Sequence, residues 1–175
     1  VLSKTGVLTR RYLGTFYCTT AGNGQTEDSF ANRFLWNYYN RVLRPMRVVE
    51  ATDTWNYTTA TIRQANGSTA NQLNFVLGVA EDMVSAEIIT GALNTAAAVQ
   101  VQVGIGLDST TTFTSGGLMS FMDTNVVNRA VMLVASLKTY PAVGLHFLAW
   151  NEFSQATGTT TFFGDNGGPT LRQSG

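Results

Sequence analysis

Alternation of apolar and polar residues with a period of two is the feature that most limits how this chain can fold. The clearest run covers 99–107, where Val or Ile at odd positions alternates with Gln or Gly at even positions before ending at Leu107. This pattern puts one row of side chains in a core and the other in solvent, so it predicts a β-strand. Further strands are predicted at 12–18, 73–79, 84–88, 131–137, 145–150 and 159–163.

The predicted strands recur with turn residues between them and without a long helical pattern, which favours an all-β protein built as an antiparallel, jelly-roll-like β-sandwich. Composition agrees, because the chain holds 25 threonines, 17 glycines and only 3 prolines. Threonine suits pleated strands and glycine suits turns. We expect less than about a tenth of the residues in α-helix. The expected core contains Leu73, Phe75, Leu77, Val79, Val101, Val103, Ile105, Leu133 and Phe147.

The segment 27–42 fits two periods. Phe30, Phe34 and Tyr38 lie at helical spacing after Thr26, which could cap a helix. The same stretch is dense in aromatic residues and also alternates, which favours a strand from about Arg33 to Val42. We therefore predict the strand, with the helix as the alternative.

Charge divides the chain into two parts. Residues 1–50 carry seven cationic and three anionic side chains, whereas 51–175 carry four and eight, so the formal charges are +4 and −4. Pro45 marks a boundary, because the residue before a proline is pushed to extended geometry. We expect 1–44 to be a short β-rich connecting segment, or the remnant of an upstream domain, that packs on a neighbour. Residues 45–175 are expected to form the sandwich.

Several classes of function are disfavoured by composition. The formal net charge is zero, so no overall basic field attracts nucleic acid, and no apolar run is long enough to insert in a membrane as a helix. With one Cys and one His, the chain has few of the side chains that bind metals or form a catalytic triad. We therefore expect no metal, no cofactor and no catalytic residue.

The residues that suggest chemistry have simpler explanations. His146 lies in an apolar run, where a satisfied core or interface histidine is the favoured interpretation over a base. Glu81 and Asp82 could suggest the carboxylate pair of a glycosidase, but adjacent strand residues face opposite ways, and a solvated turn fits better. The loop at 165–168 has oxygen ligands and glycines that suit calcium, yet it lacks the further carboxylates of a dedicated site, and a plain hairpin turn is favoured.

Aromatic residues are the remaining lead. They occur among abundant Asn and Thr, a combination that suits sugar binding because a pyranose stacks on a ring while its hydroxyls find hydrogen-bond partners. Core filling and subunit packing are the alternatives for each one. The candidate glycan or interface contacts are Trp36, Tyr38, Tyr39, Trp55, Tyr57 and Trp150.

Six stretches resemble structural proteins of bacteriophages and prophages, some of them tail-fibre-like. They are 10–16, 24–29, 33–41, 50–60, 103–111 and 157–167. Similar proteins have a β-rich segment before the stretch Arg10–Gly14, so we expect that this chain is cut from something longer. The resemblance implies a component of the virion and carries no catalytic motif.

Taken with the composition, the resemblance leads us to expect a non-enzymatic virion surface protein, a receptor-binding module of tail-fibre type that meets host surface glycans and other virion proteins. A capsid decoration or head-fibre protein is the alternative, and a polysaccharide-cleaving tailspike domain is a third. With only 13% charged residues a monomer would expose apolar patches. We therefore expect a homo-oligomer, a homotrimer first, with Trp36, Tyr38 or Phe34 at the subunit boundary.

Overall fold

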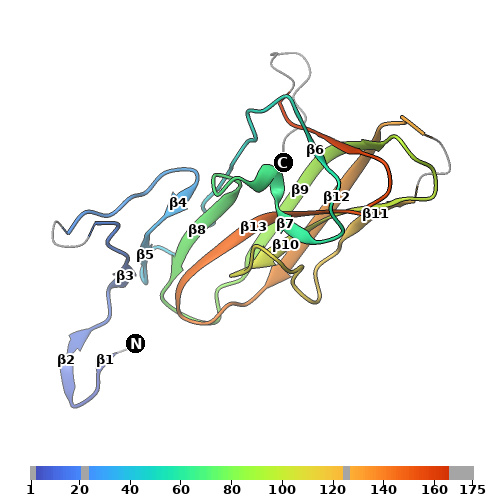
Figure 1. The fold of residues 1–175 in the computed structure, drawn as a ribbon. Coiled ribbons are helices and arrows are strands. Elements are labelled where there is room, and N and C mark those ends of the chain that lie inside the picture. Colours follow the sequence, from blue (N-terminus) through green and yellow to red (C-terminus); the bar gives the residue numbers. More distant parts are fainter. Residues whose placement is uncertain (1–2, 21–23, 124–126, 166–175) are drawn as a thin grey trace.

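Two β-sheets stacked face to face form the body of the protein (Figure 1). The computed structural model describes residues 3–20, 24–123 and 127–165. Strands make up 47% of the described residues, which contain no α-helix and only a 3-10 turn at Ala65–Gly67. The predicted all-β sandwich is therefore confirmed.

The first sheet has the strand order β11 (Ser120–Asp123), β10 (Gln100–Leu107), β13 (Gly144–Ser154), β8 (Gln72–Leu77) and β4 (Asn32–Arg33), with β7 (Ile62–Gln64) also paired to β13. The second has the order β12 (Val131–Thr139), β9 (Val84–Asn94), β14 (Thr160–Phe163) and β6 (Thr54–Tyr57). All pairs in the two sheets are antiparallel except β4 with β8. From β6 onward the chain crosses repeatedly between the sheets, as the jelly-roll-like prediction expects.

The core lies between the inner faces of the two sheets. Its buried members from the predicted set are Phe75, Leu77, Val79, Val101, Val103, Ile105 and Leu133, and Leu73 is half-buried against them. Phe147 was predicted wrongly. It is half-buried, because in β13 the inward face carries Leu148 and Trp150, and Phe147 has the opposite parity.

The segment before the sandwich is also made of strands. β1 (Ser3–Lys4) pairs with β2 (Val7–Arg11), and β3 (Gly14–Phe16) pairs with β5 (Leu35–Asn37). No helix covers 27–42. The predicted strand from Arg33 to Val42 was too long, because the strand ends at Asn37 and the chain turns at residues 38–39.

The connecting segment is attached to the edge of the first sheet rather than to its centre. β4 adds two residues beside β8, and the Phe34 side chain that follows is buried. Residues 40–48 then run without strand structure along a cavity of about 920 Å³, whose apolar lining includes Phe75, Leu77 and Val84. The proposed division at residue 44 stays a prediction.

Candidate functional site: an aromatic cluster beside the sandwich

The six aromatic residues that the sequence singles out fall into two separate groups. Trp36, Tyr38 and Tyr39 meet at the surface, where Tyr12 joins them. Trp55, Tyr57 and Trp150 lie in the core, with only 4–7% of their surface exposed. Rings so deeply buried cannot offer a face to a sugar, so the prediction of glycan contact is wrong for these three.

The surface group, which we call the aromatic cluster, consists of Tyr12, Trp36, Tyr38 and Tyr39. The Tyr12 and Trp36 rings are stacked, with centroids 5.9 Å apart and planes at 27°. Tyr38 meets Trp36 edge-on at 6.0 Å, and Tyr39 meets Tyr38 edge-on at 5.2 Å. Stacked and edge-on contacts at these distances are the favourable arrangements of aromatic rings.

Backbone pairing places these rings together. The short antiparallel pair of β3 and β5 sets Thr15 opposite Trp36, and the Tyr38 amide donates to the Leu13 carbonyl at 2.9 Å. Beneath the cluster, Gly78 leaves room for the indole, since a Cβ there would lie 2.2 Å from Trp36 Cε3. The absence of a side chain at Gly78 thus allows Trp36 to pack against the end of β8.

A carboxylate on the turn after β8 fixes the indole. Trp36 Nε1 donates to Asp82 Oδ2 at 2.7 Å, and Arg41 Nε donates to Asp82 Oδ1 at 2.9 Å. Arg41 also reaches Glu81 Oε1 at 2.8 Å. Hydrogen bonds to Asp82 and then Glu81 raise the pKa of Arg41 above its ordinary value. The turn predicted for Glu81 and Asp82 is present, and both carboxylates form ion pairs with Arg41.

A surface groove of about 640 Å³ adjoins the cluster. It is lined by Tyr38 from the connecting segment, by Gly78, Val79, Ala80 and Glu81 from the turn after β8, and by Val143 from the turn before β13. The Tyr39 side chain is 56% exposed, and that of Glu81 is 69% exposed. The groove therefore combines the Tyr38 ring with an accessible carboxylate, and Tyr39 is exposed beside Tyr38; such groups suit the binding of a carbohydrate.

The buried aromatic group surrounds a second carboxylate. Trp55 stacks on Phe162 with centroids 5.7 Å apart and donates from Nε1 to Glu152 Oε2 at 2.7 Å. Arg63 Nε donates to Glu152 Oε1 at 2.7 Å, and its guanidinium covers the Tyr57 ring at 3.8 Å. The Asn66 amide completes the set at 3.3 Å. Trp55 and Tyr57 thus hold a buried ion pair.

Glu152 is the residue that sequence reasoning missed. Its side chain has no exposed surface, and burial raises its pKa to about 7 although Trp55 and Arg63 oppose the shift. A signal was present, because Glu152 shares the parity of the buried Leu148 and Trp150 in one strand. A charged residue at an inward position predicts a partner, and that partner is Arg63.

His146 is hydrogen-bonded on both sides, as the sequence interpretation expected. Its Nδ1 lies 2.7 Å from Asp108 Oδ2, and its Nε2 lies 2.8 Å from the Ala142 carbonyl oxygen. Both neighbouring oxygens are hydrogen-bond acceptors. Asp108 Oδ1 also accepts from the Phe147 amide at 2.9 Å. These hydrogen bonds connect Asp108, which follows β10, to the start of β13.

Replacing Asp108 by alanine should lower the free energy of unfolding by about 1–3 kcal/mol, because His146 and the Phe147 amide lose their acceptor. Asp108 has a φ of 54°, which alanine adopts less readily than asparagine. Asp108→Asn keeps an oxygen for the Phe147 amide and should cost less than half as much. Denaturant unfolding of both variants checks the order, and equal losses would contradict it.

The described residues hold no cluster of three or more metal-ligating side chains. The predicted turn or calcium loop at 165–168 lies outside the described residues except for Asp165. Within the same ranges, no helix has the length and apolarity needed to cross a membrane.

Comparison of the chain with protein-family models, with curated proteins and with solved structures found no match.

Proposed function

We propose that this chain is a non-enzymatic surface protein of a bacteriophage virion, a receptor-binding module of tail-fibre type that binds host surface glycans through the aromatic cluster. The observation that carries the proposal is the meeting of Trp36, Tyr38 and Tyr39 beside an open groove. The resemblance of the chain to phage structural proteins supports the virion as its location.

In the proposed complex a pyranose ring lies on the exposed face of Tyr39 or Tyr38. Its hydroxyl groups donate to the Glu81 carboxylate, which remains accessible although it pairs with Arg41. Asp82 and Arg41 act as positioning residues, because they hold the indole and the turn rather than the sugar. A site of this kind needs no metal and no cofactor.

The direct test is a glycan array of host surface polysaccharides probed with the purified protein. Tyr38→Ala and Tyr39→Ala should each weaken binding about tenfold or more, since a lost ring contact of about 1.4 kcal/mol corresponds to a factor of ten. Tyr17→Ala is the matched control. Tyr17 is 41% exposed, but its ring packs on Phe34 at 5.2 Å, outside the cluster.

Two outcomes would reject the proposal. Wild-type binding that survives both cluster substitutions places the glycan elsewhere, and absence of any binding removes the adhesion function. If the bound polysaccharide acquires new reducing ends, and one Asp or Glu substitution abolishes their release, the chain is a tailspike enzyme.

Self-association belongs to the same proposal, with a homotrimer as the first expectation. Apolar side chains remain exposed on the second sheet, among them Ile89 at 42% and Met132 at 51%. Symmetric association would cover such a surface. Light scattering at micromolar concentration should give the mass of an oligomer, and a stable monomer would contradict it.

Capsid decoration is the second candidate, favoured by one feature. The β1–β2 hairpin extends away from both sheets (Figure 1), where it is free to bind a neighbouring virion protein. A particle reconstruction decides between the candidates, because a decoration protein lies on the shell and a receptor-binding module lies on the tail.

A further inference from the structure

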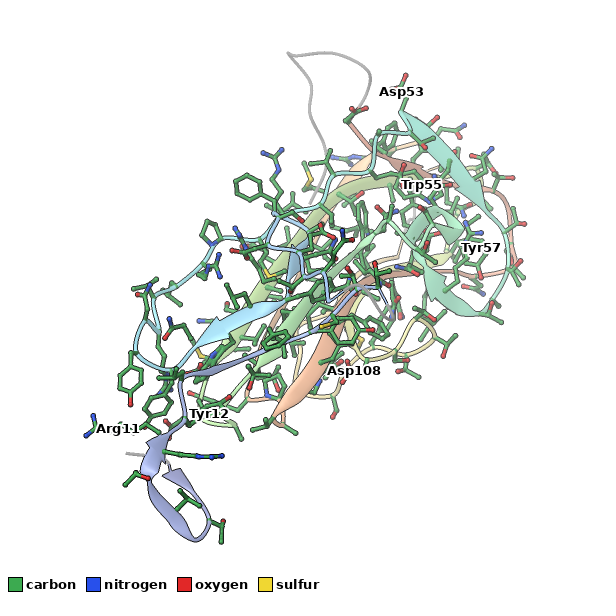
Figure 2. All side chains as sticks on the ribbon, turned by 90° about the vertical axis from the view of Figure 1, so that its left-hand side faces the viewer. Arg11, Tyr12, Asp53, Trp55, Tyr57 and Asp108 are labelled. Carbon is green, nitrogen blue, oxygen red and sulfur yellow. The ribbon has the colours of Figure 1, made fainter. Side chains whose placement is uncertain are left out.

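The β1–β2 hairpin has no support from the rest of the chain. Its two strands pair only with each other among the described residues, and Figures 1 and 2 show it projecting from the body. A two-stranded hairpin alone is at best marginally stable in water. A packing surface on another molecule would supply what it lacks.

We call residues 3–13, the hairpin and its base, the arm. The side chains of the arm limit which surface of another molecule it can pack against. Arg10 and Arg11 are exposed, and neither has an ion-pair partner within the described ranges. Figure 2 places Arg11 where the hairpin joins the chain, next to Tyr12. Leu13 is 69% exposed. The arm therefore fits a surface that is apolar and carries negative charge.

One face of the sandwich is apolar and carries a carboxylate without a described ion-pair partner, although Lys138 is also exposed on it. On the outer side of β9 and β12, Ile89 and Val134 are cross-strand partners with 42% and 37% of their surface exposed. Met132 is adjacent and 51% exposed. Glu87, two pairs along, is exposed and opposite Ser136, and no described cation pairs with it. We call these four residues the β9–β12 face.

We propose that the arm of one copy docks on the β9–β12 face of a second copy, with Arg10 and Arg11 toward Glu87 and Leu13 against Ile89 and Val134. The inference rests on the self-association proposed above and names its contact. Arg10 and Arg11 on the arm and Glu87 on the face provide the complementarity, since none of the three has a described ion-pair partner. Arm and face are different surfaces, so the contact links each copy to the next, and a threefold rotation would close three copies into a trimer.

Charge reversal tests the pairing. Arg10→Glu with Arg11→Glu should raise the dissociation constant of the oligomer at least tenfold in light scattering at low salt, and Glu87→Arg should do the same. Combining all three substitutions should restore association. Arg47→Glu and Asp53→Arg are the controls, since both residues are exposed and lie outside the arm and outside β9 and β12. Thermal unfolding confirms that the variants remain folded.

Cross-linking tests the placement. The chain has a single cysteine, Cys18, so Cys18→Ser gives a background without thiols. Copies with Leu13→Cys are mixed with copies carrying Val134→Cys and treated with a short bis-maleimide. A product that contains one chain of each kind, and that is absent when Val134→Cys is replaced by Thr61→Cys, supports the contact.

The outcomes separate this inference from the glycan site. An oligomer unchanged by the reversals and not cross-linked overturns the arm contact and leaves self-association standing. A monomeric wild type overturns both. Binding of the arm to DNA or to anionic vesicles by a monomeric protein also overturns it. Glycan binding is measured separately: Tyr12 belongs to both the arm and the cluster, but Tyr38, Tyr39 and Glu81, which contact the proposed sugar, lie outside the arm.

Discussion

Replacing Glu152 by alanine should lower the free energy of unfolding by about 3–5 kcal/mol, the range found when one member of a buried ion pair is removed. Trp55 Nε1, the Asn66 amide and the Arg63 guanidinium all donate to this carboxylate. The variant leaves Trp55 Nε1 and the Asn66 amide without this acceptor, and it leaves Arg63, whose side chain is 33% exposed, without its ion-pair partner. The total free energy of unfolding of a protein domain is only about 5–15 kcal/mol, so this loss would be a large part of it.

Denaturant unfolding at one fixed protein concentration measures the loss. Asp53→Ala is the control, because Asp53 is exposed at the start of β6 (Figure 2) and should change the stability by less than about 0.5 kcal/mol. A Glu152→Ala variant within about 1 kcal/mol of the wild type would show that the buried network contributes little.

The same residue predicts a dependence of stability on pH. Burial raises the pKa of Glu152 from 4.5 to about 7, so between these values the folded state binds a proton that the unfolded state has released. Stability therefore falls as the pH rises from 4.5 to 7, by about 3 kcal/mol for a shift of this size. Glu152→Gln should remove this slope. A wild-type stability that rises with pH across this window would contradict the assignment.

At lower pH the dependence reverses, and stability falls as the pH falls. Burial works to raise the pKa of Glu50, but the Thr52 backbone and the Asn71 side chain donate hydrogen bonds that bring its pKa below 4.5. Its contribution is therefore present above pH 4.5 and is lost as the pH falls. The optimum of stability should lie at about pH 5.

The strands could be predicted because the alternation of the sequence is a direct record of sheet geometry. In the run 99–107 the odd-numbered apolar residues face the core, as the alternation predicts, and Val101 and Val103 are fully buried. The error at Phe147 arose where both parities of β13 are apolar, and composition then does not say which face is the core.

The candidate site was predictable only in part, because burial of an aromatic residue depends on contacts distant in sequence. Trp36 is at the surface and Trp55 is in the core, although both sit in short, polar, aromatic stretches. Both indoles donate to a carboxylate that is distant in sequence, Trp36 to Asp82 and Trp55 to Glu152. The Glu152 side chain has no exposed surface, whereas that of Asp82 is 21% exposed. Tyr12 joins the cluster through a contact with Gly78, 66 residues away.

Gly78→Val should release the aromatic cluster from the sandwich while leaving the sandwich folded. A Cβ at this position would lie 2.2 Å from Trp36 Cε3 and 2.5 Å from Tyr12 Oη, closer than side chains can approach. Overpacking of this kind costs about 1–3 kcal/mol. Because the strain falls on the docked segment, it should appear as local opening of residues 35–48.

Trypsin cleavage measures that opening, since Arg41 and Arg47 lie in the segment. A cost of about 2 kcal/mol should raise the rate of cleavage there about thirtyfold, because cleavage follows the population of the open form. Glycan binding should fall in parallel. The core contacts of Trp55 are remote from this change, so global unfolding should shift much less.

A double-mutant cycle identifies the cause. If the clash with the indole is responsible, Trp36→Ala removes the cluster's anchor and most of the clash together. Gly78→Val should then add little to the cleavage rate of Trp36→Ala, although each substitution alone raises it strongly. Additive effects would mean that Gly78 acts elsewhere, for example through the backbone of the turn that carries Asp82. A wild-type cleavage rate in Gly78→Val would show that the indole does not pack on β8 in solution.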